Sequence, residues 1–459
     1  MNSNEILSIL ELQRNYFKAG NTFDLNKRKK KLKELSKNIK NNIELIYEGL
    51  YKDLGKSRTE SYMCEIGLVL NEISFILKHM NKYLKPRRVK TPLAQFKSKS
   101  YELSYPYGNV LIMSPWNYPF LLAIEPLCEA IACGNTVILK TSEYSVNTNS
   151  VIKKIVSEIF SKEEAYVIFG GIEENKILMN AKFDYVFFTG SKKVGNALYE
   201  AQAKYMTPMT LELGGKSPCI IDRNVNLKLA ARRIVFGKFL NLGQTCVAPD
   251  YILCDDSICD EFIKYVKIEI ERQFGKNPLE NKNYGNIITN RQLERIIGLI
   301  DYDKVIYGGR YDLDKLKLEP TIMDNVLYTD KIMSEEIFGP VMPIIRYKDN
   351  LEFLNYINEH DAPLAFYVFT NDKKKANFYI NNIGFGGGCI NDVVIHLATS
   401  NMRFGGYKES GIGSYHGVMG FQTFSHYKSI VNKSTHIDLP MRYAPYSKKN
   451  DKLIKMFLR

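Results

Sequence analysis

In the segment 109-NVLIMSPWNYPFLLAIEPLCEAIACGNTVILKTS-142, two short apolar runs flank a longer apolar run of helical length. Continuous apolar runs of this kind are typical of strands buried on both faces, and a helix between two of them joins parallel strands. The alternation continues through SVIKKIVSEIF (150–160), AYVIFG (165–170), YVFFTGS (185–191) and VGNALYEAQAK (194–204). We therefore predict an α/β fold with an open parallel sheet covered by helices on both faces.

A second alternating series begins near Pro218 and runs to about Asn391. It contains the apolar or amphipathic runs PCIID, LKLAARRIVFGKFL, PVMPIIRY, LEFLNYINEH and LAFYVFT. The chain therefore holds two α/β units in tandem. Before them, apolar residues at three- and four-residue steps from Asp24 to about Tyr51 predict one helical face, and a second periodic stretch runs from about Glu60 to Leu84. The polar segment VKTPLAQFKSKS that follows is expected to form a strand pair or connector.

Bulk composition narrows the class of protein. The 459 residues are 45% hydrophobic and 25% charged, which suits a globular protein with a large core. No stretch is apolar enough to predict a spanning helix, and the N-terminus does not read as a secretory signal, so a cytoplasmic protein is expected. The eight cysteines contain no CxxC pair, which argues against a zinc site or a disulfide framework. The net charge of +13 is spread along the chain, which favours a solvated surface over nucleic-acid binding.

Three side chains could carry chemistry. Cys246 lies at a bend in NLGQTCVAP, where a thiol can face a cleft or pack as a small apolar residue. Glu212 ends the apolar run of TLELGGKSP; a buried acid there could act as a base or serve as a structural hydrogen-bonding group. Asn117 stands between two prolines in MSPWNYPF, where it could aim an amide at an oxyanion or form a turn.

Two further segments suit a phosphate-bearing ligand. ILKTSE places Lys140 and Glu143 after a predicted buried strand, at the edge where open α/β sheets bind ligands. FFTGSKKVG places Gly190 and Ser191 at the start of a helix, where backbone N–H groups favour a phosphate. Because Gly190 and Gly195 do not complete a GxGxxG pattern, an ordinary strand-to-helix turn is the alternative.

The order of the motifs is more specific than any one of them. PWNYP, LKTSE, FTGS, LELGGKSP, GQTC, EEIFGP and FGGYKESGIG follow one another as in the aldehyde dehydrogenase superfamily, which the chain resembles over about residues 10–440. The segments SGIGSYHGVMGFQTFSHYKSI and RYAPYSKK resemble the class 3 branch, whose members oxidise medium- and long-chain aliphatic or aromatic aldehydes. The motif MRFGGYKESG departs from many class 3 relatives, which leaves the shape of the substrate funnel open.

The resemblance implies roles for individual residues. For catalysis they are Cys246 as nucleophile, Asn117 as oxyanion donor and Glu212 as general base, with Glu336 as the rival base. For NAD or NADP they are Lys140 and Glu143 at the adenosine ribose, Gly190, Ser191 and Gly195 at the pyrophosphate turn, Glu336 at the nicotinamide ribose and Phe338 beside its ring. Tyr118 either lines the substrate funnel or packs in the core. No metal is expected, and the choice between NAD and NADP stays open.

The resemblance also implies an organisation. A Rossmann-like cofactor domain is expected at 1–86 and 106–213, a catalytic α/β domain at 214–400, a small bridging and oligomerisation element at 87–105 and 401–435, and a tail at 436–459. A homodimer is the expected assembly. The basic tail is too short to span a membrane and would allow at most a weak contact with an anionic membrane surface. Two alternative functions stay open: a CoA-acylating aldehyde dehydrogenase or acyl reductase, and a non-catalytic protein that keeps the fold.

Overall fold

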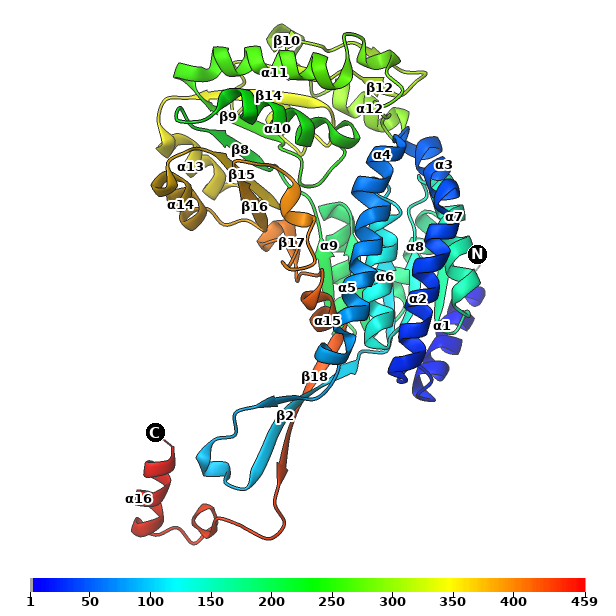
Figure 1. Ribbon diagram of the computed structural model, residues 1–459, viewed down its shortest axis with the longest axis vertical. Coiled ribbons are helices and arrows are strands. Elements are labelled where there is room, and N and C mark those ends of the chain that lie inside the picture. Colours follow the sequence, from blue (N-terminus) through cyan, green and yellow to red (C-terminus); the bar gives the residue numbers. More distant parts are fainter. Residues whose placement is uncertain (1–2, 459) are drawn as a thin grey trace.

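Two helix-covered parallel sheets and a long arm make up the structure, a computed structural model that describes residues 3–458 (Figure 1). The predicted α/β class is confirmed. The first sheet has the order β17-β7-β6-β3-β4-β5, and only β17 runs antiparallel to its neighbour. Its strands are β3 (Asn109–Met113), β4 (Thr136–Lys140), β5 (Ala165–Ile168), β6 (Tyr185–Thr189), β7 (Met209–Glu212) and β17 (Gly411–Ile412).

Side chains alternate between two buried faces along the strands of this sheet. Val110 and Ile112 of β3 pack with one set of helices, whereas Leu111 and Met113 pack with another. The first face is covered by α2 (Leu25–Asn41), α3 (Ile43–Leu54), α5 (Gly67–Tyr83), α6 (Leu121–Cys133) and α7 (Val146–Ile159). The second is covered by α1 (Ser3–Lys18), α8 (Ile172–Asn180) and α9 (Lys192–Ala203).

The strand order places a crevice beside β3. The chain moves from β3 to β4 and β5 on one side, then returns to lay β6 and β7 on the other. The connections that leave β3 and β6 therefore diverge, and such a switch point is where open α/β sheets bind ligands. Asn117 follows β3 and Gly190 follows β6, so both predicted site segments lie at this crevice.

The second sheet has the order β10-β13-β14-β9-β8-β15-β16. Its strands are β8 (Pro218–Ile221), β9 (Tyr251–Asp255), β10 (Val305–Tyr307), β13 (Thr321–Met323), β14 (Val341–Tyr347), β15 (Ala365–Phe369) and β16 (Gly387–Ile390). Its helices are α10 (Leu227–Phe239), α11 (Cys259–Phe274), α12 (Asn290–Ile297), α13 (Asn350–Glu359) and α14 (Lys373–Asn382), and a small hairpin joins β11 (Tyr311–Asp312) to β12 (Lys317–Leu318). Cys246 precedes β9 and Glu336 precedes β14. The predicted site residues of this sheet therefore lie at the amino ends of its strands.

The helical face predicted from Asp24 to Tyr51 is divided at Asn42. Asn42 has backbone angles of φ −103° and ψ 17°, which are not helical, and its side-chain amide donates to the Asn38 carbonyl at 3.0 Å, so α2 ends there before α3 begins. The second periodic stretch forms α4 (Arg58–Ser61), a π-helical turn at Tyr62–Ile66 and α5.

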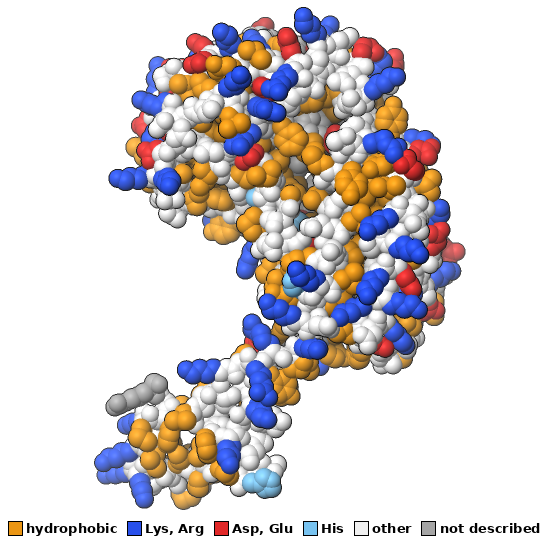
Figure 2. All heavy atoms as spheres, viewed as in Figure 1, with side chains coloured by type: hydrophobic (Ala, Val, Ile, Leu, Met, Phe, Trp, Pro, Cys, Tyr) orange, Lys and Arg blue, Asp and Glu red, His pale blue; other side chains and the backbone are white. Residues whose placement is uncertain are grey.

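The arm is a three-stranded antiparallel sheet of β1 (Arg87–Val89), β2 (Ser98–Pro106) and β18 (Ser425–Lys433). It projects from the body and ends near α16 (Lys448–Phe457), while α15 (Val418–Thr423) lies at its base (Figure 1). Figure 2 shows apolar side chains among Lys and Arg at the far end of the arm. No helix within residues 3–458 is long and apolar enough to cross a membrane.

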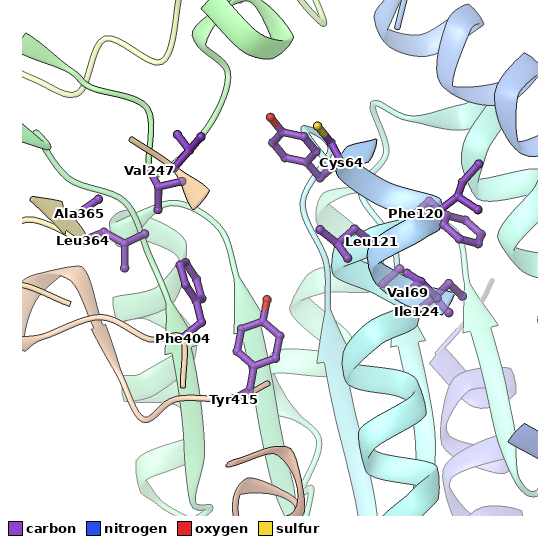
Figure 3. Packing of buried hydrophobic residues seen from close by; sticks show 14 of the residues in the cluster. Cys64, Val69, Phe120, Leu121, Ile124, Val247, Leu364, Ala365, Phe404 and Tyr415 are labelled. Carbon is purple, nitrogen blue, oxygen red and sulfur yellow. The ribbon is translucent and has the colours of Figure 1, made fainter. Parts of the chain in front are cut away.

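One apolar cluster joins the two sheets. It contains Phe120 and Leu121 at the start of α6, and also Val247 beside Cys246 and Leu364 before β15 (Figure 3). The segments that carry the predicted site residues are therefore anchored in a common core.

Candidate active site

A cleft of about 1090 Å³ brings together most of the predicted site residues. Its lining comes from the segment after β3, the turn after β6, the end of β7 and the segments before β9 and β14. The predicted residues that line it are Asn117, Gly190, Ser191, Glu212, Cys246, Glu336 and Phe338. Binding clefts of roughly 300–1,000 Å³ hold drug-sized ligands, so there is room for a dinucleotide and part of a substrate.

The turn before Cys246 is tightly constrained. Asn241 and Leu242 have positive φ angles of 49° and 52°, and Gly243 has a φ of 70°. A Cβ atom at Gly243 would lie 2.3 Å from the Gly339 carbonyl oxygen, so only glycine allows the two segments to meet this closely. Residues in left-handed conformations are costly and often occur at functional sites. This contact holds the turn at residues 241–246, the cysteine turn, against the turn at Phe338 and Gly339.

Cys246 is a half-buried thiol. All eight cysteines are free, and only Cys246 and Cys389 are more than minimally exposed. Burial, followed by the nearby carboxyl groups of Glu336 and Glu212, raises the pKa of the Cys246 thiol to about 12. The protein groups around this thiol therefore do not by themselves make it a thiolate at neutral pH.

Hydrogen bonds tie the Asn117 segment to the cysteine turn. The Asn117 side-chain amide donates to the Gln244 carbonyl at 3.1 Å, and the Asn241 amide donates to the Asn117 carbonyl at 2.9 Å. Gln244 itself bridges the Asn241 carbonyl and the Ile288 N–H, at 3.0 Å each. The amide predicted to hold an oxyanion is thus buried and fixed relative to the backbone just before Cys246.

Glu212 is a buried carboxyl group at the end of β7. It is 2% exposed, and neither side-chain oxygen has a hydrogen-bond partner within residues 3–458. Burial raises the pKa of Glu212 well above its ordinary value. A carboxyl group whose pKa is raised in this way is a stronger base than an exposed one once it loses its proton.

Glu336 is held in the cleft by its neighbours. Lys216 contacts Asp250 at 2.5 Å and the Glu335 carbonyl at 2.9 Å, while Asp250 accepts the Ile337 N–H at 2.9 Å. Burial and the charge of Asp250 raise the pKa of Glu336 to about 8. A Cβ atom at Gly214 would lie 2.2 Å from the Glu336 carboxylate, so the segment after β7 passes directly beside it.

Phe338 has a positive φ of 48°, an uncommon conformation for an aromatic residue. Its ring meets that of Trp116 edge to face, with 5.4 Å between the centroids. The two rings come from the two halves of the molecule and together form an aromatic part of the cleft wall.

The turn after β6 fits the phosphates of a dinucleotide. Gly190 and Ser191 line the cleft at the start of α9, together with Lys192 and Lys193. A Cβ atom at Gly190 would lie 2.6 Å from the Phe188 ring, so a side chain at this position would collide with that ring. The first turn of a helix and two lysines favour an anion.

Several predicted residues lie elsewhere. Gly195 is buried within α9, where a Cβ atom would lie 2.8 Å from Leu213, so it permits close packing of the helix. Lys140 is buried, with its ammonium donating to the Thr141 carbonyl at 2.6 Å, and Glu143 is exposed; neither lines the cleft. Tyr118 is 7% exposed, and its hydroxyl pairs with the Thr245 hydroxyl at 2.6 Å. Both observations agree with the alternative that Tyr118 packs in the core.

Sequence reasoning did not single out Lys216, Asp250, Asn241 and Gln244. Lys216 and Asn241 do lie within the quoted motifs LELGGKSP and NLGQTCVAP. Their role in holding the site together cannot be inferred from these motifs, because each side chain bonds to segments that are distant in sequence.

A cleft between two mainly parallel sheets, lined by a thiol, two carboxyl groups and a glycine-containing strand-to-helix turn, is an arrangement expected of a dinucleotide-dependent α/β enzyme. The family model described as the Aldehyde dehydrogenase family matches residues 1–430. The 4,4'-diaponeurosporen-aldehyde dehydrogenase of Staphylococcus aureus is 44% identical, over 97% of both chains. The mouse dimeric NADP-preferring aldehyde dehydrogenase is 41% identical, over 94% of this chain and 95% of its own.

Solved structures agree with these sequence relatives. The substrate-bound state of Staphylococcus aureus AldH has a TM-score of 0.97 at 43% identity and covers 99% of both chains. An indole-3-acetaldehyde dehydrogenase in complex with NAD+ has a TM-score of 0.86 at 27% identity, over 94% of this chain and 90% of its own. The chain belongs to the aldehyde dehydrogenase family. It is an NAD(P)-dependent enzyme that oxidises aldehydes to carboxylates, as the class 3 resemblance implied.

Proposed function

We propose that the protein oxidises medium- or long-chain or aromatic aldehydes through a covalent thioester on Cys246. The observation that carries this mechanism is the convergence of Cys246, Asn117, Glu212 and Glu336 on the cleft that Gly190 and Ser191 also line. The name of the Staphylococcus aureus relative refers to one such aldehyde, 4,4'-diaponeurosporen-aldehyde.

The proposed reaction begins at the thiol. Cys246 Sγ gives its proton to solvent water and attacks the aldehyde carbon, and the resulting alkoxide accepts hydrogen bonds from the Asn117 amide and the Cys246 N–H. An oxidised nicotinamide held beside Phe338 and Glu336 would supply the hydride acceptor, and loss of hydride from the adduct carbon would leave the Cys246 thioester. Water then attacks the thioester carbon, a carboxylate takes the water proton, and the carbon–sulfur bond breaks to release the acid and the thiolate.

We assign the deacylation base to Glu212, with Glu336 as the rival. Glu212 has two buried oxygens without partners, which leaves them free to bind water. Glu336 lies between the segments of Gly214 and Asp250, and we assign it to the nicotinamide ribose with Phe338 beside the ring. Gly190 and Ser191 hold the pyrophosphate. Lys140 and Glu143, at the carboxyl end of β4, are assigned to the adenosine ribose.

The decisive experiment follows absorbance at 340 nm with octanal and either NAD or NADP. We expect steady reduction that Cys246→Ala abolishes and that Cys389→Ala, the matched change at the other exposed thiol, leaves intact. Glu212→Gln should give one burst of reduction per active site and then stop. If Glu336→Gln gives that burst instead, the two carboxylates exchange roles. Reduction that requires added CoA would favour the acyl-transfer alternative, and no reduction with any aldehyde would favour a non-catalytic protein.

We further propose a cytoplasmic homodimer joined through the bridging element at 87–105 and 401–435, which contains most of the arm. β18 is a nine-residue edge strand, and an unpaired edge of that length is usually covered. One relative is named as dimeric. Eight free thiols suit a reducing compartment. Light scattering should give twice the mass of the chain. Sedimentation with anionic vesicles tests the weaker alternative, in which the tail at 436–459 contacts a membrane surface.

A further inference from the structure

A buried ion pair lies behind the Asn117 segment. Lys56 follows α3 and Glu65 lies in the π-helical turn Tyr62–Ile66, and both side chains are 0% exposed. The Lys56 ammonium and the Glu65 carboxylate are 2.6 Å apart. Two charges are rarely taken so completely out of water unless their geometry is held by further hydrogen bonds. Neither residue lines the cleft, so neither can touch the substrate there.

Each member of the pair also bonds to the segment that carries Asn117. Lys56 donates to the Asn117 carbonyl at 2.7 Å. Glu65 accepts the N–H groups of Phe120 at 2.8 Å and Leu121 at 3.2 Å, where α6 begins. The pair therefore holds both ends of the segment 117–121, and a rigid pair of charges fixes these positions more firmly than water could. Figure 3 shows Phe120 and Leu121, and Cys64, the neighbour of Glu65, belongs to the same apolar cluster.

The same ammonium orders the residue beside Asn117. Lys56 Nζ lies 3.9 Å from the centre of the Tyr118 ring, and the Tyr118 hydroxyl pairs with Thr245, directly before Cys246. Lys56 thus bonds directly to the segment after β3. Through Tyr118 it is also linked to the cysteine turn. The Asn117 carbonyl receives a second hydrogen bond from Asn241 of that same turn.

We propose that Lys56 and Glu65 are a positioning pair for the oxidation step, which aims the Asn117 amide at the oxyanion that forms on the Cys246 adduct. This inference rests on the proposed role of Asn117. Displacement of an oxyanion donor by a fraction of an ångström weakens a hydrogen bond that matters only in the transition state. Loss of the pair should therefore lower the rate of hydride transfer and leave cofactor affinity unchanged.

The test is a double-mutant cycle in the full-length enzyme with octanal and NAD. Lys56→Met with Glu65→Gln removes both charges together, so no single buried charge is left, and the Gln oxygen can still accept from Phe120 and Leu121. We expect single-turnover hydride transfer to fall about 10- to 100-fold, toward the rate of Asn117→Ala. Added to Asn117→Ala, the paired change should lower the rate less than about twofold further.

A partly exposed control pair, Lys31 and Glu164, lies away from the cleft. Lys31 also bridges a carboxylate and a carbonyl, with Glu164 at 3.1 Å and the Ile159 carbonyl at 2.5 Å. Lys31→Met with Glu164→Gln should leave hydride transfer within about twofold of the unmodified enzyme, as expected for a pair distant from the chemistry. If the Lys56 variant does not fold, the milder Glu65→Gln replaces it, with a smaller loss that again disappears in the Asn117→Ala background.

The outcomes separate the two proposals. If the paired change at Lys56 and Glu65 lowers the hydride-transfer rate equally with and without the Asn117 amide, the positioning role is overturned. The pair is then a structural element only. An unchanged rate after loss of the pair would overturn it as well. If Asn117→Ala itself retains the full hydride-transfer rate, the oxyanion assignment fails, and the positioning role fails with it.

Discussion

The contact between Gly243 and Gly339 gives a sharp test of the site geometry, through Gly243→Ala. The new Cβ would lie 2.3 Å from the Gly339 carbonyl oxygen and 3.0 Å from that of Lys238, both backbone atoms that cannot rotate away. Close carbon–oxygen contacts lie near ~3.3 Å, so the two turns must separate by about 1 Å. Displacements of this size near reacting groups can lower a rate on the order of 100-fold.

Backbone strain adds a separate cost. Gly243 has a φ of 70°, where alanine is destabilised by about 1–2 kcal/mol. Gly20 has a φ of 77° and would place a Cβ no closer than 3.8 Å to any atom, so Gly20→Ala isolates the strain from the clash. Single-turnover hydride transfer measures the chemical step, and urea unfolding measures stability. Both variants should lose stability, but only Gly243→Ala should lose rate. Full hydride-transfer activity in Gly243→Ala would refute the view that this contact sets the position of Cys246.

Three further predictions concern single groups in the cleft. Because the pKa of Cys246 is raised to about 12, alkylation by iodoacetamide without cofactor should rise about tenfold per pH unit between about pH 7 and pH 9; a plateau near pH 8 would contradict this. The folded-state pKa of Glu336 is raised from 4.5 to about 8, so its favourable contribution is present below 4.5 and is lost as the pH rises through 8. Glu336→Gln should thus raise the melting temperature more at about pH 9 than at about pH 5, and equal shifts would show that Glu336 is not buried as described. Gly190→Ala, whose Cβ would lie 2.6 Å from Phe188, should weaken NADH binding about tenfold in fluorescence titration, whereas Gly171→Ala, with open space around it, should not.

Local patterns predicted the elements well where packing follows the chain. The apolar runs from Asn109 to Met113 and from Thr136 to Lys140 became buried parallel strands, because residues at successive positions meet opposite faces of a sheet. The division of the helix at Asn42 was not predicted. Apolar residues keep helical spacing across it, and only the backbone angles of Asn42 and its side-chain bond to the Asn38 carbonyl show that the helix ends there.

The sequence predicted the location of some motif residues better than that of others. Asn117, Glu212 and Cys246 lie together in one cleft because each stands at the end or start of a strand, and strand ends meet at the edges of sheets. Lys140 ends β4 and Glu143 follows it, yet both lie outside that cleft, because β4 is one strand farther from the switch point than β3. Distance across a sheet depends on strand order, which no local pattern contains.

By itself, the sequence determined the α/β class, the family and the residues able to carry chemistry, since these depend on local periodicity and on short motifs in a fixed order. The tertiary structure alone decided which of those residues meet, that the Cys246 thiol has a raised pKa, and that Lys56 and Glu65 hold the Asn117 segment from behind. Burial and hydrogen bonding depend on groups brought together from distant parts of the chain. These contacts exist only once the chain has folded.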